Sequence, residues 1–507
     1  MNHQDISAVP KLLVTAIAGT LIAIAGSVSA APTYSITNVL VANDQYQGET
    51  GLTPAPVYKP HETDASAQPK YWISSNERGD EETGTGKGGI SIFEYGTNKV
   101  LSTLNIENAC IPVVKPSGNA GGCAPKGAEG HPRHPHGIDI DDAKKLAYQV
   151  IEHSGLRWNR NRNTIVPAHN TDIESSLLVV YDIADPTHPK ILRGYVLGHA
   201  AEEAVVNDNN GKIYAGNHEP SATKVPCFVS VIDPSSRNPY KFIDLPSATQ
   251  CVQGLDVDEY LNTVNGTTHV GQKMYTFNSA NDTIAYSVNI RPAFDAFVSG
   301  LPASQKFTIP DGWVIHMHDL ATDKTNHRAY QTIHTIAELA VVEASEEDGA
   351  VETGNEITGR WVAEVNTNPS SPNFKKVNII DLSNGQSVPA VPTHEDTQAD
   401  FANRFVHAHF LAVDPGRYSL IVSGEHTGNL GVVDTNSRLL KQVLAISRPI
   451  PGCVRTPEID EDTGLPLPLG APEPHVHGTN IQAVKGTAYV SDEGEDCFYE
   501  SVTILKP

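Results

Sequence analysis

A pair of histidines separated by one residue recurs along this sequence, and the recurrence limits the folds open to the chain. The pair reads His134-Pro135-His136 at its first occurrence and returns as His316-Met317-His318, His407-Ala408-His409 and His475-Val476-His477. Weaker copies of the surrounding sequence pattern are centred on His199 and Gln253. After each copy come a short apolar run, a turn and a second apolar run. Such self-similarity predicts a repeat protein in which every unit contributes the same few strands.

The unit that begins at His136 shows the strand pattern most clearly. Its apolar runs are Ile138–Ile140, Leu146–Ile151, Leu177–Asp182 and Ile191–Val196. The third run, apolar residues that end in Asp, recurs as Val229–Asp233, Val377–Asp381 and Leu430–Asp434. Short runs bounded by turn residues, in a chain with 40 glycines and 35 prolines, indicate an all-β fold.

Units that start near residues 136, 199, 253, 318, 409 and 477, with one more unit before them, predict a single seven-bladed β-propeller with loop insertions over residues 31–507. The last unit has the runs His477–Ala483, Thr487–Ser491 and Ser501–Leu505 and lacks one strand. We expect Tyr34–Val41 to supply that strand and close the ring, because closure removes an exposed sheet edge. The unit at His318 is enlarged by an insertion, Ile336–Asn368, part of which we expect to form a helix or lid.

The amino terminus reads as a targeting segment. Lys11 precedes an apolar run, Leu12–Ala25, and Val28-Ser29-Ala30 offers small residues for cleavage before Ala31. This predicts a cleaved signal peptide over residues 1–30 and export to the periplasm. An uncleaved membrane anchor is the alternative, although the apolar run is short for a membrane span.

The six cysteines agree with an oxidising compartment, because an even number permits full pairing. Their order along the chain favours Cys110–Cys123, Cys227–Cys251 and Cys453–Cys497, each within or between neighbouring units. A copper–thiolate site is the weaker interpretation, since the closely spaced cysteine pairs typical of such sites are absent.

The formal net charge of −23 argues against nucleic acid and anionic membranes as partners, because both attract clustered positive charge. We therefore expect no nucleic-acid partner and no membrane insertion of the mature protein.

The histidines are expected to converge on one end of the propeller axis. The innermost strand of a blade runs along the channel and the second strand returns beside it, so the start of the first and the end of the second share a rim. Histidines two residues apart on a strand face the same way. The predicted metal ligands are His134, His136, His153, His199, His218, His316, His318, His334, His407, His409, His426, His475 and His477.

Metal binding is the interpretation that best explains so many imidazoles on one rim. Protonated imidazoles would repel one another, and a bound cation removes that problem. Many imidazoles without thiolates suit copper first, with iron or zinc after it, and the number of ligands indicates a cluster of two to four ions. Off-pattern histidines, such as His188 and His269, are expected only to form hydrogen bonds at strand ends.

Three other residues are candidates for chemistry on this rim. Asp319 follows His318 directly and Glu425 precedes His426, so either carboxylate could transfer protons or orient a ligand. Lys87, in a glycine-rich loop, could hold an anion or donate a proton. The alternatives are a turn-capping carboxylate and a surface lysine. Arg157, Arg160 and Arg162, after His153, suggest guidance of a small anion.

At these residues the chain resembles exported copper β-propeller oxidoreductases. It is similar to the propeller domain of nitrous oxide reductase and, in having a signal segment and no cupredoxin domain, resembles thiocyanate dehydrogenase more closely. The resemblance rests on the His134-Pro135-His136-Gly137 start, the later histidine pairs and Lys87. It implies three histidine-bound copper ions, oxidation of thiocyanate to cyanate and sulfur, and an external electron acceptor such as a cytochrome c.

Two other classes stay open. One is a metal-binding or scaffolding propeller without turnover, which predicts tightly held metal with no open coordination position. The other is a mononuclear iron oxygenase of the four-histidine propeller type, which predicts one iron ion and an apolar tunnel.

Overall fold

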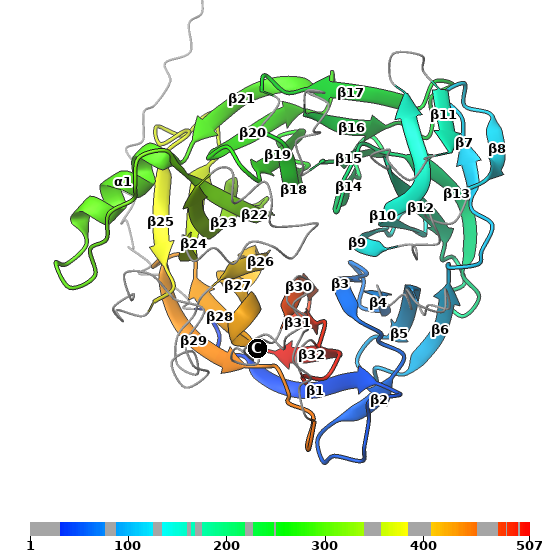
Figure 1. The fold of residues 1–507 in the computed structure, drawn as a ribbon, viewed down its shortest axis with the longest axis horizontal. Helices are drawn as coiled ribbons and strands as arrows, with labels where there is room; N and C mark the ends of the chain where they lie inside the picture. Colours follow the sequence, from blue (N-terminus) through cyan, green and yellow to red (C-terminus); the bar gives the residue numbers. More distant parts are fainter. Residues whose placement is uncertain are drawn as a thin grey trace, which may run out of the picture.

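The computed structural model describes residues 31–76, 88–124, 134–159, 164–167, 175–217, 227–247, 250–338, 356–383, 407–453, 475–482, 484–494 and 497–507. Within these ranges the strands form seven sheets around a central axis (Figure 1). The chain is therefore an all-β propeller, as the repeat predicts. No helix in the described ranges is long and apolar enough to cross a membrane.

Each sheet follows the same course from the axis outward, and its neighbouring strands are antiparallel except where β7 joins β13 and β2 joins β1. The first contains β3 (Pro60–Ala65), β4 (Tyr71–Asn76), β5 (Gly89–Glu94) and β6 (Val100–Asn105). The next contains β9 (Pro135–Asp141), β10 (Leu146–Asn159), β12 (Ser175–Asp182) and β13 (Lys190–Val196), extended by β11 (Thr164–Pro167) and the hairpin of β7 (Pro112–Val114) and β8 (Ala120–Cys123).

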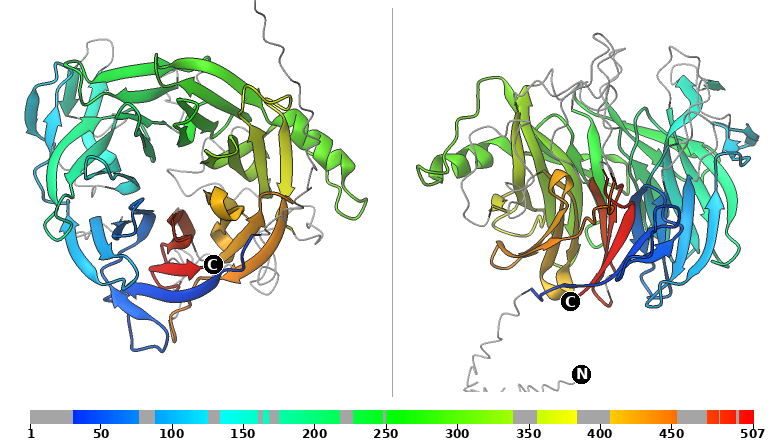
Figure 2. Two further views of the ribbon diagram at one scale, coloured as in Figure 1. Left: turned by 180° about the vertical axis from the view of Figure 1, so that it is seen from behind. Right: turned by 60° about the horizontal axis from the view of Figure 1, so that its bottom comes forward.

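Four regular sheets follow along the chain. They are β14 (Ala204–Asn207), β15 (Lys212–Ala215), β16 (Phe228–Ile232) and β17 (Tyr240–Asp244); β18 (Val252–Asp258), β19 (Thr263–Thr268), β20 (Lys273–Asn278) and β21 (Thr283–Asn289); β22 (Trp313–Asp323), β23 (Arg328–Glu338), β24 (Glu356–Asn366) and β25 (Val377–Asp381); and β26 (Ala408–Asp414), β27 (Ser419–Gly424), β28 (Asn429–Asp434) and β29 (Leu439–Ala445). Helix α1 (Arg291–Gly300) lies outside the ring (Figure 2). Short 3-10 turns cover Pro415–Arg417 and Glu425–Thr427.

The two ends of the described chain share one sheet. It contains β30 (Val476–Gln482), β31 (Thr487–Asp492) and β32 (Ser501–Lys506), followed by β1 (Ser35–Ala42) and β2 (Thr53–Ala55). β1 runs antiparallel to β32, with Leu40 opposite Val502, and Figure 1 shows β1 along the outer side of this sheet. The amino-terminal strand therefore covers the edge that β32 would otherwise expose.

The hydrophobic core lies between neighbouring sheets. One cluster joins Trp72 and Phe93 of the first sheet to Tyr489 of the last, and the Trp72 and Phe93 rings stack at 4.1 Å between centroids. Burial of side chains of this size contributes about 1.5–3 kcal/mol each. The disulfides Cys110–Cys123, Cys227–Cys251 and Cys453–Cys497 are all formed, which confirms the predicted pairing and agrees with an oxidising, exported environment.

The enlarged unit differs from the prediction. Most of the described part of Ile336–Asn368 is strand, because β23 and β24 pair along their length; residues 339–355 lie outside the described ranges. β24 is the third strand, so Val377–Asp381 is the fourth strand and not the third as its Asp suggested. β24 ends in Asn366 and lacks that signature, while its Trp361 is buried beneath Phe294 of α1.

Carboxylates on the inner strands join each sheet to the next. Asp139 accepts the N–H of Val206 at 2.7 Å, and Asp256 accepts the N–H of Thr322 at 2.6 Å. Asp319 accepts the N–H of Leu411 at 2.8 Å. These bonds fix the inner strands relative to one another, and so fix where their first residues meet.

Candidate metal centre

The inner strands present one side chain each to the same place near the axis. In six of them the register shifts around that residue or opposite it, which is the mark of a β-bulge. A bulge turns a side chain out of the regular alternation. The residues at this position are His61, His136, Gln253, His318, His409 and His477. We call the histidines among them the central histidines.

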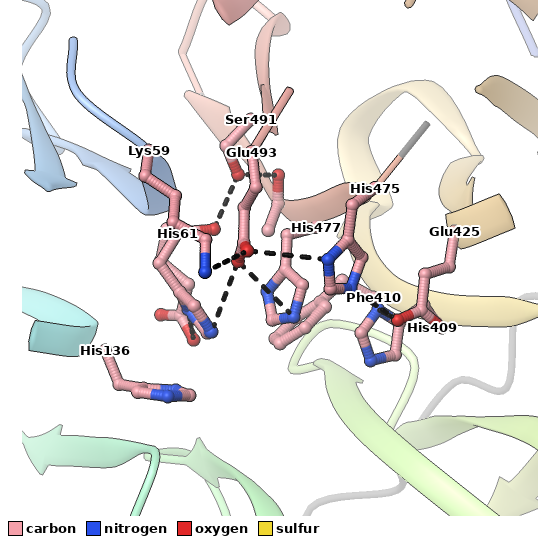
Figure 3. A network of polar contacts seen from close by, with 12 residues as sticks. Lys59, His61, His136, His409, Phe410, Glu425, His475, His477, Ser491 and Glu493 are labelled. Carbon is pink, nitrogen blue, oxygen red and sulfur yellow. Dashed lines mark hydrogen bonds and ion pairs between the residues drawn. The ribbon is translucent and has the colours of Figure 1, made fainter. Parts of the chain in front are cut away.

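The central histidines are in contact with one another. The His61 ring lies 3.7 Å from that of His136 and 3.8 Å from that of His477, between centroids. His409 lies 4.5 Å from His477 and 3.8 Å from His318. Five inner strands, β3, β9, β22, β26 and β30, thus deliver imidazoles to one cluster, part of which is drawn in Figure 3.

In three of the four pairs the first histidine lies nearer the solvent than the second. We call the four first histidines, His134, His316, His407 and His475, the rim histidines. The His134 side chain is 32% exposed and that of His475 is 22% exposed, against 2% for His61. His316 is buried and stacks on His269 with 3.9 Å between centroids. The prediction placed His269 outside the cluster, and the structure places it against a cluster member, because β19 ends on the same rim.

Three carboxylates occupy equivalent positions where second strands end. The backbone N–H groups of Glu152, Glu425 and Glu493 donate to the carbonyl oxygens of His134, His407 and His475, at 2.9, 3.0 and 2.9 Å. The same backbone bond in three sheets brings each carboxylate to the histidines on this rim. Glu152 faces the pair of its own sheet, whereas the shortest contacts of Glu425 are to histidines of the two neighbouring sheets.

Each carboxylate contacts several imidazoles. Glu152 Oε2 lies 3.1 Å from His134 Nδ1 and 3.3 Å from His136 Nε2. Glu425 lies 2.6 Å from the Nε2 atoms of both His334 and His475.

Glu493 lies between three imidazoles from two strands (Figure 3). Its Oε1 atom is 3.8 Å from His61 Nε2 and from His477 Nε2, and its Oε2 atom is 3.4 Å from His475 Nδ1. Carboxylates and imidazoles therefore alternate around the rim.

The protonation states suit cation binding. Burial is the main cause of a pKa well below the ordinary range for the imidazoles of His61, His318, His409 and His477, and repulsion from neighbouring imidazoles adds to it. Burial alone would raise the pKa of the Glu152 carboxyl, but hydrogen bonds from His134 and His136 hold it well below its usual range. Neutral imidazole and ionised carboxylate are the forms that ligate a metal.

Unsatisfied nitrogens provide an independent test of whether a metal fits. The Nδ1 atoms of His136, His318, His334 and His477 are buried without a hydrogen-bond partner among the described residues. Leaving such a nitrogen unpaired is costly. The Nε2 atoms of His318 and His409 lie 2.9 Å apart, close to the separation of about 2.8–3.3 Å expected for two nitrogens on one ion with bonds of about 2.0 Å.

Four sets of described residues bring ligand atoms within 4.8 Å of one another. They are His134, His136 and Glu152; His334, His407 and Glu425; His409, His475 and His477; and His61, His477 and Glu493. The last two sets share His477, so they compete for one ring.

An amide side chain and a phenyl ring also lie against the central histidines. Gln253 Nε2 donates to Glu202 Oε2 at 2.7 Å and lies 2.8 Å from His318 Nε2. Phe410 follows His409 and its ring contacts those of His61, His318, His409 and His477, at 4.5–6.2 Å between centroids. The buried Phe410 ring therefore forms an apolar floor under the central histidines.

Some predicted residues are not brought together. Asp319 accepts two backbone N–H groups, from Leu320 and Leu411, so its role is to join strands and the catalytic role predicted for it is not supported by its contacts. Three predicted ligands among the described residues belong to none of the four sets: His199, in the turn before β14, and His316 and His318, on β22. Lys87 and His218, and the side chains of His153 and His426, lie outside the described part of the chain.

The sequence analysis missed His61, Lys59 and Glu493. Pro60-His61 repeats the Pro135-His136 dipeptide, and that repetition was the available signal. The pair is incomplete here because Lys59 stands where the other pairs have their first histidine. Glu493 could have been found from the strand-end glutamates at Glu152 and Glu425.

No protein-family model matches the chain, and no curated protein matches it. Solved structures similar in fold include Raptor of Chaetomium thermophilum (8% identity, TM-score 0.51, 94% of this chain and 29% of that one), the β-propeller domain of Cps50 (Swd1) of Myceliophteria thermophila (9%, 0.49, 94% and 100%) and hydrazine synthase of Kuenenia stuttgartiensis (11%, 0.49, 91% and 99%). At these identities the likeness concerns the propeller fold alone.

Proposed function

We propose that this protein is an exported oxidoreductase with a multinuclear copper centre that oxidises a small inorganic anion. The observation that carries the proposal is the cluster of imidazoles from five inner strands, together with the carboxylates of Glu152, Glu425 and Glu493 on the same rim. We also interpret the seven sheets as seven blades closed by β1, an interpretation supported by the pairing of β1 with β32.

The sharing of His477 limits the number of ions. Of the four ligand sets, two need His477 and two are independent, so one plus two gives three ions per chain. A fourth would need His477 to bridge two ions through both nitrogens. Disulfides occupy every cysteine, so imidazole and carboxylate are the ligand types left for a copper centre.

Thiocyanate is the first substrate to test, on the strength of the resemblance to thiocyanate dehydrogenase. Its oxidation adds water and breaks the carbon–sulfur bond, giving cyanate, elemental sulfur, two protons and two electrons. Copper, when bound, would accept the electrons, and a cytochrome c or similar acceptor would remove them. The chain's own contribution would be to hold the anion at the rim, to exclude water from below through Phe410, and to receive protons on carboxylates such as Glu425.

The experiment is elemental analysis of protein purified from the periplasm and loaded with copper, followed by thiocyanate oxidation with an artificial electron acceptor. We expect about three copper ions per chain and turnover. The exposed His188 pairs with Asp185 at 3.0 Å. His188→Ala is therefore the matched control, which should keep both the copper content and the turnover. Copper at trace level in the wild type would contradict the proposal.

Iron is the second candidate, and a specific observation favours it. Three of the four ligand sets contain two histidines and one glutamate, the ligand types of mononuclear iron(II) oxygenases. One tightly held iron ion per chain would support that class. Tightly held metal without turnover of any anion would support a binding or scaffolding propeller.

A further inference from the structure

Two of the four ligand sets compete for His477, and their surroundings differ. One consists of His409, His475 and His477, and the other of His61, His477 and Glu493. An ion held by the first set takes the His477 ring from the second. Whichever set binds a cation more weakly is therefore left without metal.

Lys59 disfavours metal in the second set. Its Nζ atom lies 3.4 Å from Glu493 Oε2, so an ammonium group already neutralises the carboxylate that a cation would need. Like charges at such distances repel. Among the described residues whose ion pairs touch this cluster, Lys59 is the one ammonium; the other cationic partners are imidazoles.

The position of Lys59 is fixed by the backbone. Lys59 has a φ of +43°, in the left-handed region that a lysine rarely adopts. Its N–H donates to Glu500 Oε2 at 2.7 Å, and the buried Glu500 is itself bonded to Gln45. The first sheet thus holds a lysine where other sheets hold the first histidine of a pair.

We propose that Lys59, His61 and Glu493 form a metal-free subsite for a singly charged anion, beside a metal held by His409, His475 and His477. This inference rests on the proposed function and assigns the substrate class to a particular corner of the cluster. The Lys59 side chain is 33% exposed while His61 is 2% exposed, so the subsite leads from solvent to the cluster. Figure 3 shows Lys59 beside the Glu493 carboxylate, with the His61 ring below.

The subsite also selects by charge. An anion accepts hydrogen bonds from Lys59 Nζ and from the His61 ring, and both donors lie next to Glu493. Lys59 balances the charge of Glu493, so the metal held by His409, His475 and His477 supplies the net positive charge that favours an anion. The nearby carboxylate repels a doubly charged anion such as sulfate more strongly than a singly charged one. Thiocyanate is the probe of the favoured class.

The test compares Lys59→Gln and Lys59→Arg with Lys485→Gln, which removes the same charge from an exposed turn at the other end of β30. Thiocyanate affinity is measured by calorimetry on metal-loaded and metal-free protein, and metal content by elemental analysis. We expect Lys59→Gln to weaken thiocyanate binding about tenfold or more and to leave the number of ions unchanged, because the metal held by His409, His475 and His477 still occupies the His477 ring. Lys59→Arg and Lys485→Gln should match the wild type.

Unchanged thiocyanate affinity in Lys59→Gln would overturn the inference. An equal loss of affinity in Lys485→Gln would overturn it too, since the effect would then be one of overall charge. Failure of the proposed function is a separate result: wild-type protein that holds no copper contradicts that function, while thiocyanate binding to the metal-free protein still decides whether Lys59 anchors an anion.

Discussion

The inner strands divide into two sectors, which have a similar backbone course but carry different side chains near the axis. β3, β9, β22, β26 and β30 carry the central histidines, and we call their sheets the histidine sector. β14 and β18 belong to the other sector, where Glu202 precedes β14 and Gln253 stands at the bulge of β18. Six of the seven inner strands have a bulge at this position, and we expect the side chain at the bulge to decide whether a cation binds.

The largest effect is expected for His477→Ala, because His477 belongs to two of the four ligand sets. Copper content should fall from about three ions to about two, with an affinity loss at the affected set above the roughly 10–100-fold typical of outer-shell changes. Elemental analysis and paramagnetic resonance check this. Gln253→Ala, the equivalent change in the other sector, should keep all ions; loss of the same ion from both variants would erase the distinction between sectors.

Removing a carboxylate charge sharpens the comparison further. Glu425→Gln keeps the shape of a side chain that lies 2.6 Å from His334 and His475, and should weaken one ion by roughly 10–100-fold. A competitive chelator titration measures the loss. Glu202→Gln is the matched change in the other sector, where Glu202 accepts a hydrogen bond from Gln253 Nε2 at 2.7 Å. Equal effects of the two substitutions would show that total charge, and not ligand position, sets the affinity.

In the metal-free protein, buried imidazoles of the cluster and buried carboxyls that join strands should change the free energy of unfolding with pH in opposite directions. Burial lowers the pKa of the His318 imidazole, so the unfolded state binds more protons, and the stability that this group contributes is lost as pH falls below about 6.5. Burial raises the pKa of the Asp319 carboxyl to about 7, so the stability that it contributes is lost as pH rises from about 4 towards 7.

Denaturant titrations of metal-free protein over this pH range measure both effects. His318→Gln should flatten the acid side of the stability profile, because glutamine does not titrate. A profile of His318→Gln that falls on acidification as steeply as that of the wild type would contradict a depressed imidazole pKa.

The sequence predicted more of the fold than of the site, and the reasons are physical. Disulfide partners followed from order along the chain, and strands followed from apolar runs between turns. His61 was not predicted because Lys59 stands in place of the first histidine of its pair. The predicted motif was defined by residue type, whereas the repeat preserves a backbone position. Glu493 was not predicted because no histidine follows it, whereas Glu152 and Glu425 each precede a histidine. β24 was not predicted as a third strand because it ends in Asn366, in place of the Asp that ends other third strands.

Asp319 shows why adjacency in sequence misleads. It follows His318, yet successive residues of a strand face opposite ways, so the two side chains at the bulge have different contacts. His318 turns into the cluster, while Asp319 accepts backbone N–H groups of Leu320 and Leu411. The same arrangement holds at Asp256, which accepts the N–H groups of Val257 and Thr322.

The smallest effect is therefore expected for Asp319→Asn. Its amide would leave one of the two backbone donors unpaired, which should lower the free energy of unfolding by about 1–3 kcal/mol without changing metal content. Asp256→Asn should cost a similar amount, because that carboxylate makes the same two bonds away from the histidines. Denaturant melts and elemental analysis of both variants decide the matter. If Asp319→Asn alone lost metal or activity, Asp319 would take part in the chemistry, and the division between the residues that bind cations and those that join strands would have to be redrawn at the bulge itself.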